Sequence, residues 1–207
     1  PKAIILILHG FSEHSGRYLN LINQFQNQKF ALFAYDQRGH GKSKGKRGHV
    51  DSFMDYIYDL KLFIDLIRQK NKKTPIILFG HSMGGVIATK YIQIFPSDIK
   101  AAILSSPTFI LKLKVSKFKK TIAKGLSKIF PKLSMKSNLE PKLLTKDQAV
   151  IEEHENDYLV YDKASARFYT EYTAASEKIL NSLQDISWNF RRKSYLDGGD
   201  FWIHYSI

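Results

Sequence analysis

Residues 80–84 read Gly-His-Ser-Met-Gly and stand between two segments of different pattern. The residues before them, 75–79, form a short apolar run that predicts a buried strand, and residues 85–95 predict a helix. A serine on a tight strand-to-helix turn, with a glycine two residues to either side, is typical of a nucleophile elbow, which exposes the hydroxyl. The sequence therefore predicts Ser82 as a catalytic nucleophile.

Apolar runs and helical patterns alternate through the first half of the chain. Buried strands are expected at 3–8, 31–35, 75–79 and 101–104, and helices at 17–28, from 52 and at 85–95. This alternation predicts an α/β fold with a mostly parallel sheet and helices on both faces. Ligands of such sheets bind beyond the carboxyl ends of the strands. Four polar residues are expected to meet there: His9, Asp36, Ser82 and Ser105.

The alternation stops after Pro107. Residues 115–129 have apolar positions spaced 3, 4, 4 and 3 apart, with lysines on the opposite side, which predicts a basic amphipathic helix. We interpret residues 108–170 as a helical cap inserted above the sheet. Residues 1–107 and 171–207 would then form the core, with a helix near 164–185 and a return to the sheet from 186.

The net charge of +13 is concentrated in one segment. Residues 107–147 hold eleven lysines and two acids, Glu140 and Asp147. An anionic membrane surface fits this charge, with peripheral contact through residues 112–136. The alternative, which we favour for the apolar stripe, is a lid that packs its apolar face on the core while its lysines are solvated. Nucleic acid is the alternative partner, but no recognition motif accompanies the lysines, so no nucleic-acid binding is expected.

The composition excludes other classes of protein. There is no cysteine, so disulfides and thiolate metal sites are ruled out. No apolar run reaches the roughly 18 residues of a transmembrane helix, and we expect a cytoplasmic protein with peripheral membrane association. The sequence does not determine the oligomeric state.

Residues 36–43, Asp-Gln-Arg-Gly-His-Gly-Lys-Ser, are the second dense motif. Asp36 and His40 could bind a metal, but no third ligand has a suitable spacing. A structural loop is favoured, pinned by charge-assisted hydrogen bonds of Asp36 and Arg38, with Gly39 and Gly41 supplying positive φ. No metal is expected.

A nucleophilic serine needs an oxyanion hole as well as a base. One donor should be the backbone N–H of Met83, directly after the nucleophile. The other should come from the loop after the first strand, where Phe11 follows His9-Gly10. The alternative for His9-Gly10 is an ordinary exit from a strand.

Several motifs, taken in order, resemble the monoacylglycerol lipase and lysophospholipase family. They are His9 to Tyr18 (HGFSEHSGRY), the loop from Asp36 to Ser43, and the elbow from Gly80 to Gly85, with Asp157 to Arg167 similar to the segment where a cap rejoins the core. The resemblance implies an α/β-hydrolase fold with a helical lid. It also implies that an acyl-enzyme route cleaves a small lipid ester, a monoacylglycerol or lysophospholipid, with no cofactor.

The same resemblance leaves the triad incomplete. Asp200 is the best match to the family's acid, with Asp197 as the fallback and a plain turn as the alternative. No histidine stands at the family's position for the base. Residues 191–193 are Arg-Arg-Lys where the family has an aliphatic strand. The resemblance thus implies a chain shortened at both ends or altered in its tail.

Two rival functions follow from these observations. A catalytically impaired relative would bind lipid without cleaving it. A peptidase or another hydrolase would use the same fold on a different substrate, because function is set by the site and not by the fold.

Overall fold

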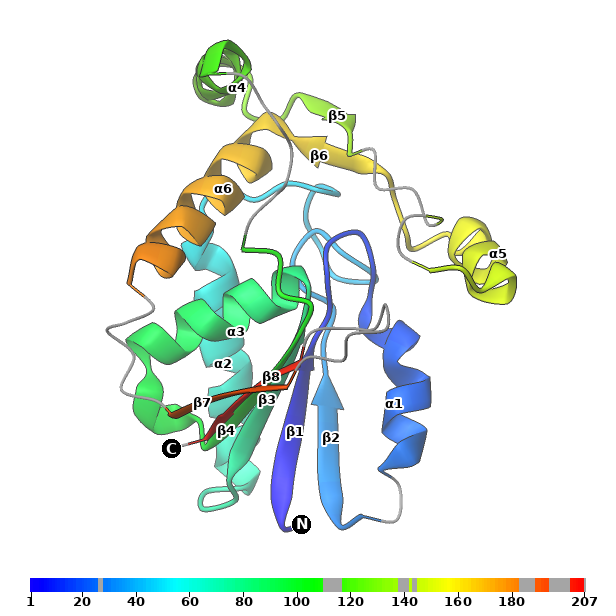
Figure 1. The fold of residues 1–207 in the computed structure, drawn as a ribbon, viewed down its shortest axis with the longest axis vertical. Coiled ribbons are helices and arrows are strands. Elements are labelled where there is room, and N and C mark those ends of the chain that lie inside the picture. The colour runs from blue at the N-terminus through cyan, green and yellow to red at the C-terminus, as the bar shows by residue number, and fades with distance from the viewer. Residues whose placement is uncertain are drawn as a thin grey trace.

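The computed structural model describes residues 1–25, 28–109, 117–137, 142, 145–182, 189–193 and 202–206. A six-stranded sheet forms the centre of the molecule, and helices cover both of its faces (Figure 1). A smaller set of elements lies beyond the carboxyl ends of the parallel strands. The predicted α/β architecture is confirmed.

The sheet has the strand order β2-β1-β3-β4-β8-β7. Its first four strands are mutually parallel, with registers such as Ile5 opposite Leu32 and Ile77. Their bounds are β1 (Ala3–Leu8), β2 (Phe30–Ala34), β3 (Ile76–His81) and β4 (Ala101–Ser105). Every residue of β1 is buried, as expected for an aliphatic strand covered on both faces.

Alternate residues of the strands belong to two separate hydrophobic clusters, one on each face of the sheet. On one face, Ile4, Leu6 and Leu8 pack with α2 (Met54–Lys70), α3 (Met83–Ile94) and α6 (Ala166–Asn181). On the other face, Ile5 and Ile7 pack against the short helices η1 (Ser15–Tyr18) and α1 (Leu19–Gln24). Because successive side chains of a strand point to opposite faces, alternate residues pack against the two different layers of helices.

Helix α2 begins at Met54, whereas the sequence predicts a start from residue 52, and the side chain of its N-cap residue, Phe53, makes no capping hydrogen bond. Asp55 accepts a hydrogen bond from the Ser52 N–H at 3.3 Å, and Ser52 Oγ accepts one from the Met54 N–H at 3.3 Å. These two hydrogen bonds give acceptors to N–H groups at the start of the helix, where no intrahelical acceptor is available. The five buried residues of α2 follow the helical period: Tyr56, Ile57, Leu60, Ile64 and Ile67.

The segment after β4 leaves the sheet. It contains α4 (Lys117–Ile129), β5 (Ser134–Lys136), α5 (Gln148–Asn156) and β6 (Lys163–Ser165), and α6 runs back from it toward the core (Figure 1). Strands β5 and β6 pair antiparallel, and α4 packs on α6. Within the described residues, none of the helices has the length and apolar character to cross a membrane.

The tail rejoins the sheet as two antiparallel strands. Strand β8 (Trp202–Ser206) pairs with β4, and β7 (Asn189–Lys193) pairs with β8 at the edge of the sheet. The Arg-Arg-Lys run therefore lies on an edge strand, where charged residues are common because they discourage pairing with other chains. A central strand would have had to bury these cations.

Candidate active site

Ser82 stands at the turn between β3 and α3 in a strained conformation. Its φ of 51° and ψ of −115° place a non-glycine residue where L-amino acids rarely lie. The turn is fixed because the Ser82 N–H donates to Ser105 O at 2.9 Å and the Gly85 N–H donates to Ser82 O at 3.1 Å. Strain of this kind, held by surrounding structure, is common at functional residues.

Glycines flank Ser82 because backbone atoms leave no room for a side chain. A Cβ on Gly80 would lie 2.6 Å from Gly84 O. A Cβ on Gly84 would lie 2.7 Å from His9 O and closer still to Leu8 O. Helix α3 therefore packs directly against the ends of β1 and β3, which brings Ser82 next to the loop after β1.

The two residues predicted as oxyanion donors lie on either side of this junction. Met83 is the first residue of α3, where backbone N–H groups have no intrahelical acceptor. Phe11 follows Gly10, and a Cβ on Gly10 would lie 3.1 Å from Ser82 Cβ. The Phe11 ring packs on Phe168 of α6 with 4.7 Å between ring centroids, which anchors the loop against that helix.

His9 has a structural role in this arrangement. The Gln37 N–H donates to His9 Nε2 at 2.9 Å, so the ring proton resides on Nδ1, which donates to Gly10 O at 2.8 Å. Burial lowers the pKa of His9, which keeps the ring neutral. Since both ring nitrogens are occupied, His9 is not available as a base for Ser82.

The hydroxyl partner of Ser82 in the structure is Thr108. The two oxygens are 3.4 Å apart, and Thr108 Oγ1 lies 2.6 Å from the hydroxyl of Tyr172 on α6. Tyr172 also donates to Thr108 O at 3.0 Å, and burial raises its pKa well above its usual value. Sequence reasoning missed this pair, because Thr108 and Tyr172 are 64 positions apart and no motif joins them.

The other histidines of the described part of the chain offer no evident base for Ser82. Three of them make side-chain hydrogen bonds to residues other than Ser82: His14 to Asp157, His49 to Ser165 and Asp51, and His81 to Ser105. His154 lies on α5. His40 is buried, and burial lowers its pKa to about 3. His204 belongs to β8, opposite Ile103.

The residues predicted as the acid of the triad lie in a part of the tail outside the described residues. Asp200 and Asp197 both lie outside the described residues. The assignment of Asp200 as the acid therefore stays a prediction.

The motif at residues 36–43 is a structural loop, as the sequence predicts. Asp36 accepts from the Ser15 N–H and hydroxyl at 2.8 and 2.7 Å and from the Lys42 N–H at 2.7 Å. Burial opposes its ionisation, but these hydrogen bonds lower the pKa of Asp36 overall. Arg38 makes a bidentate pair with Asp59, both distances being 2.6 Å. Among the described residues, the acids and histidines form no cluster of metal-binding geometry.

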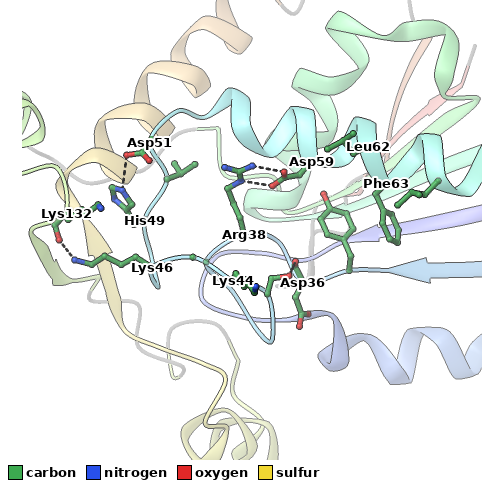
Figure 2. Close-up of a pocket in the computed structure, with 16 residues that line it drawn as sticks. Asp36, Arg38, Lys44, Lys46, His49, Asp51, Asp59, Leu62, Phe63 and Lys132 are labelled. Atoms are coloured by element: carbon green, nitrogen blue, oxygen red, sulfur yellow. Dashed lines mark hydrogen bonds and ion pairs between the residues drawn. The ribbon is translucent and has the colours of Figure 1, made fainter.

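A depression of about 610 Å³ lies between this loop and α2 (Figure 2). Its walls combine apolar residues of α2 with the Arg38–Asp59 pair and the lysines at 44, 46 and 132. Figure 2 shows Arg38 and Asp59 pointing at one another, so both charges are already paired. Ser43 in its wall donates its hydroxyl to Asp36 O at 2.5 Å. Ser82 does not line the depression, which is therefore separate from the candidate active site.

A strained serine at a strand-to-helix turn of such a sheet defines an α/β-hydrolase. The family described as "Serine aminopeptidase, S33" matches residues 1–190. The chain belongs to this family.

Two relatives of the chain carry the names of lipid hydrolases. Phospholipase YtpA of Bacillus subtilis is 37% identical over 181 residues, which are 87% of this chain and 69% of that protein. The human monoglyceride lipase is 32% identical over 161 residues, 77% of this chain and 53% of that protein. The chain thus spans between about half and two thirds of the length of these relatives.

Two solved structures similar to the chain also carry the names of monoacylglycerol lipases. The monoacylglycerol lipase of Paleococcus ferrophilus has a TM-score of 0.76 and 33% identity, covering 88% of this chain and 69% of that one. A soluble variant of the Saccharomyces cerevisiae monoglyceride lipase, in complex with a substrate analog, has a TM-score of 0.75 and 27% identity, covering 87% of this chain and 61% of that one.

Proposed function

We propose that this chain is a serine hydrolase that cleaves a carboxylic ester of a single-chain lipid, a monoacylglycerol or a lysophospholipid. The observation that carries the proposal is the strained Ser82 of the elbow, set against the loop that holds Gly10 and Phe11. The names of the relatives support the lipid ester as substrate.

The reaction uses Ser82 as nucleophile. Its Oγ attacks the ester carbonyl, and the carbonyl oxygen gains negative charge that the Phe11 and Met83 N–H groups stabilise. Each such donor lowers the barrier by roughly 3–4 kcal/mol. The C–O bond to the alcohol then breaks, the alcohol leaves with the proton from Oγ, and water hydrolyses the acyl-enzyme. Asp200 remains the proposed acid, and the base is unassigned.

Labelling with a fluorophosphonate tests the nucleophile. Wild-type protein should be labelled at Ser82, and Ser82→Ala should not be. The matched control is Ser106→Ala, which removes a neighbouring hydroxyl just after β4 and leaves the elbow sequence intact, and this variant should label normally. Labelling that persists in Ser82→Ala would contradict the proposal.

The substrate class is tested with a panel. Monoacylglycerols and lysophospholipids should be turned over, whereas aminoacyl amides should not, although the family's description includes an aminopeptidase. Amide cleavage without ester cleavage would favour the peptidase alternative. Labelling of Ser82 with ester turnover about 10⁴-fold below that of a complete relative would favour a catalytically impaired relative.

We also propose that residues 108–170 form a cap over a core of residues 1–107 and 171–207. The position of α4, β5, α5 and β6 beyond the carboxyl ends of the parallel strands supports this division (Figure 1). The contacts of Ser82 with Thr108, and of Thr108 with Tyr172, lie where a cap of this kind would meet the nucleophile.

The cap carries the proposed contact with an anionic membrane, through residues 112–136. Its described part exposes an apolar group, here called the cap patch: Ile122, Ile129, Phe130, Leu133 and Met135. Lys124, Lys128, Lys132 and Lys136 lie in the same stretch of sequence. Apolar side chains with nearby lysines suit the boundary between headgroups and acyl chains of an anionic bilayer.

Sedimentation with vesicles tests this contact. Wild-type protein should bind phosphatidylglycerol vesicles and bind phosphatidylcholine vesicles much less. Lys124→Glu with Lys128→Glu should weaken binding, since each lysine near such a surface contributes about 1 kcal/mol. The matched control is Lys72→Glu with Lys73→Glu, after α2, and binding lost equally in both variants would contradict a specific cap contact.

A further inference from the structure

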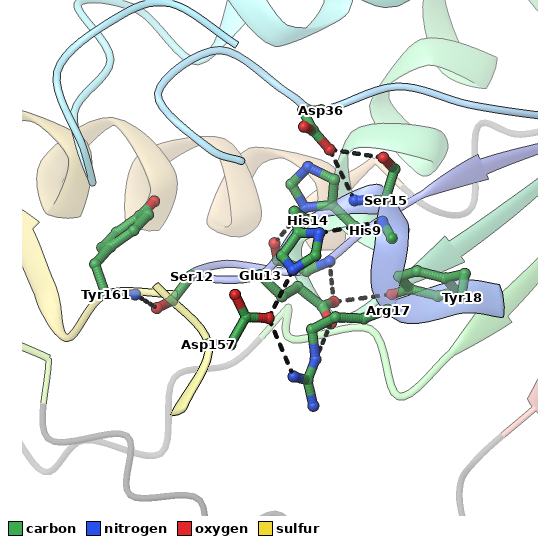
Figure 3. Close-up of polar contacts among 12 residues, drawn as sticks. His9, Ser12, Glu13, His14, Ser15, Arg17, Tyr18, Asp36, Asp157 and Tyr161 are labelled. Carbon is green, nitrogen blue, oxygen red and sulfur yellow. Dashed lines mark hydrogen bonds and ion pairs between the residues drawn. The ribbon is translucent and has the colours of Figure 1, made fainter. Parts of the chain in front are cut away.

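Glu13 lies inside the loop of residues 9–18, here called the oxyanion loop (Figure 3). One oxygen of its carboxylate, Oε1, accepts a hydrogen bond from the Gly10 N–H and another from the Tyr18 hydroxyl, the latter at 2.8 Å. Arg17 Nε lies 4.0 Å from the other oxygen. A single acceptor atom therefore ties the start of the loop to its end.

The Glu13 carboxylate is also close to the nucleophile. A Cβ on Gly10 would lie 2.6 Å from Glu13 Oε1 and 3.1 Å from Ser82 Cβ. Gly10 thus fits between the carboxylate and the serine, and a larger residue there would displace one of them.

The hydrogen bonds fix both peptide planes around Gly10. Glu13 holds the N–H of the His9–Gly10 peptide, and Gln37 Nε2 donates to the carbonyl of the same peptide at 2.5 Å. His9 Nδ1 donates to the carbonyl of the next peptide, Gly10–Phe11, at 2.8 Å. In a trans peptide the N–H points opposite to the carbonyl, so the direction of the Phe11 N–H is set as well.

We infer that Glu13 is a positioning residue that aims the Phe11 N–H at the oxyanion formed on a Ser82-bound substrate. The inference rests on the proposed function. What Glu13 supplies is an acceptor in a fixed place, since a bare negative charge beside a developing oxyanion would oppose the reaction. Arg17 offsets part of that charge.

The test compares Glu13→Ala with Glu13→Gln. Glutamine keeps an acceptor oxygen for both the Gly10 N–H and the Tyr18 hydroxyl, whereas alanine removes it. Glu13→Ala should lower kcat about 10- to 100-fold with KM within about twofold, because the oxyanion exists only after attack. Glu13→Gln should retain kcat within about threefold of wild type, since the acceptor that fixes the donor stays in place. Glu153→Ala, an exposed acid on α5, is the matched control and should match wild type.

Three outcomes would overturn the inference: an unchanged kcat in Glu13→Ala, a rise in KM alone, or a loss in Glu13→Gln equal to that in Glu13→Ala. Urea denaturation of each variant separates a loss of fold from a loss of rate. Amide hydrogen exchange at Gly10 should be faster in Glu13→Ala and near wild type in Glu13→Gln. If wild-type Ser82 is not labelled, the proposed function fails, and hydrogen exchange still shows whether Glu13 holds the loop.

Discussion

The elbow with its oxyanion loop and the cap patch differ in how tightly each residue is constrained. Around Ser82, backbone atoms pack so closely that Gly80 and Gly84 have no room for a Cβ. In α4, a Cβ on Gly125 would meet nothing within 4 Å, and Ile129 is 72% exposed. The first region therefore tolerates few side chains for steric reasons, whereas the second leaves room for larger side chains.

Gly84→Ala in the elbow is expected to have a large effect. Its Cβ would collide with the backbone carbonyls of Leu8 and His9, which cannot move without separating α3 from β1. We expect a loss of about 3 kcal/mol in the free energy of unfolding, measured by urea denaturation. A loss below about 0.5 kcal/mol would contradict the steric account of the elbow.

Stability should also depend on pH through His40, which is buried beside the oxyanion loop. Burial lowers the pKa of His40 to about 3, below the value of about 6.5 expected in the unfolded chain. The stabilisation from neutral His40 is therefore complete above about pH 6.5 and is lost as the pH falls toward 3, by up to about 1.4 kcal/mol per pH unit. His40→Asn, which keeps a donor for Arg38 O, should flatten the slope between about pH 6.5 and 4.5 in urea denaturation. An unchanged slope would show that His40 titrates normally.

Gly125→Ala should have a smaller effect of opposite sign. Alanine has a higher helix propensity than glycine, and the site is open, so we expect a gain of about 0.5–1 kcal/mol. The midpoint of thermal unfolding should rise. A destabilisation would mean that α4 packs more closely at this position than its open surroundings indicate.

The smallest expected change in stability is that of Phe130→Ser in the cap patch. Phe130 is 60% exposed, so the free energy of unfolding should change by less than about 0.5 kcal/mol while binding to anionic vesicles falls. Phe168→Ser is the matched control: Phe168 is buried against Phe11, and its loss should cost at least about 3 kcal/mol. A large loss of stability in Phe130→Ser would contradict its assignment to the surface.

Much of the fold was predictable because its signals are local. The aliphatic run of β1 and the hydrogen bond between Ser52 and Asp55 each act within a few residues, as do the glycines around Ser82. The helix expected at 17–28 is shorter, with a 3₁₀ turn at Ser15–Tyr18 followed by α1. The apolar spacing was correct there, but it does not distinguish a 3₁₀ turn from the first turn of an α-helix.

The surroundings of the nucleophile were less predictable. Thr108 reaches Ser82 where Tyr172 on α6 holds it, and Asp157 contacts His14 across 143 positions. Contacts over such separations leave no periodic pattern in the sequence. The edge position of the Arg-Arg-Lys strand was missed for the same reason, since strand order depends on which strands pair.

The alternation of strands and helices, the elbow and the identity of the candidate nucleophile follow from the amino-acid sequence alone, because each depends on the conformations available to neighbouring residues. What surrounds Ser82 was decided only by the tertiary structure: the Thr108–Tyr172 pair, the Glu13 carboxylate beside Gly10, and the neutral His9 in the same loop. The physical reason is that these groups come together through packing of distant segments, and their distances and burial exist only once the sheet and its helices have formed.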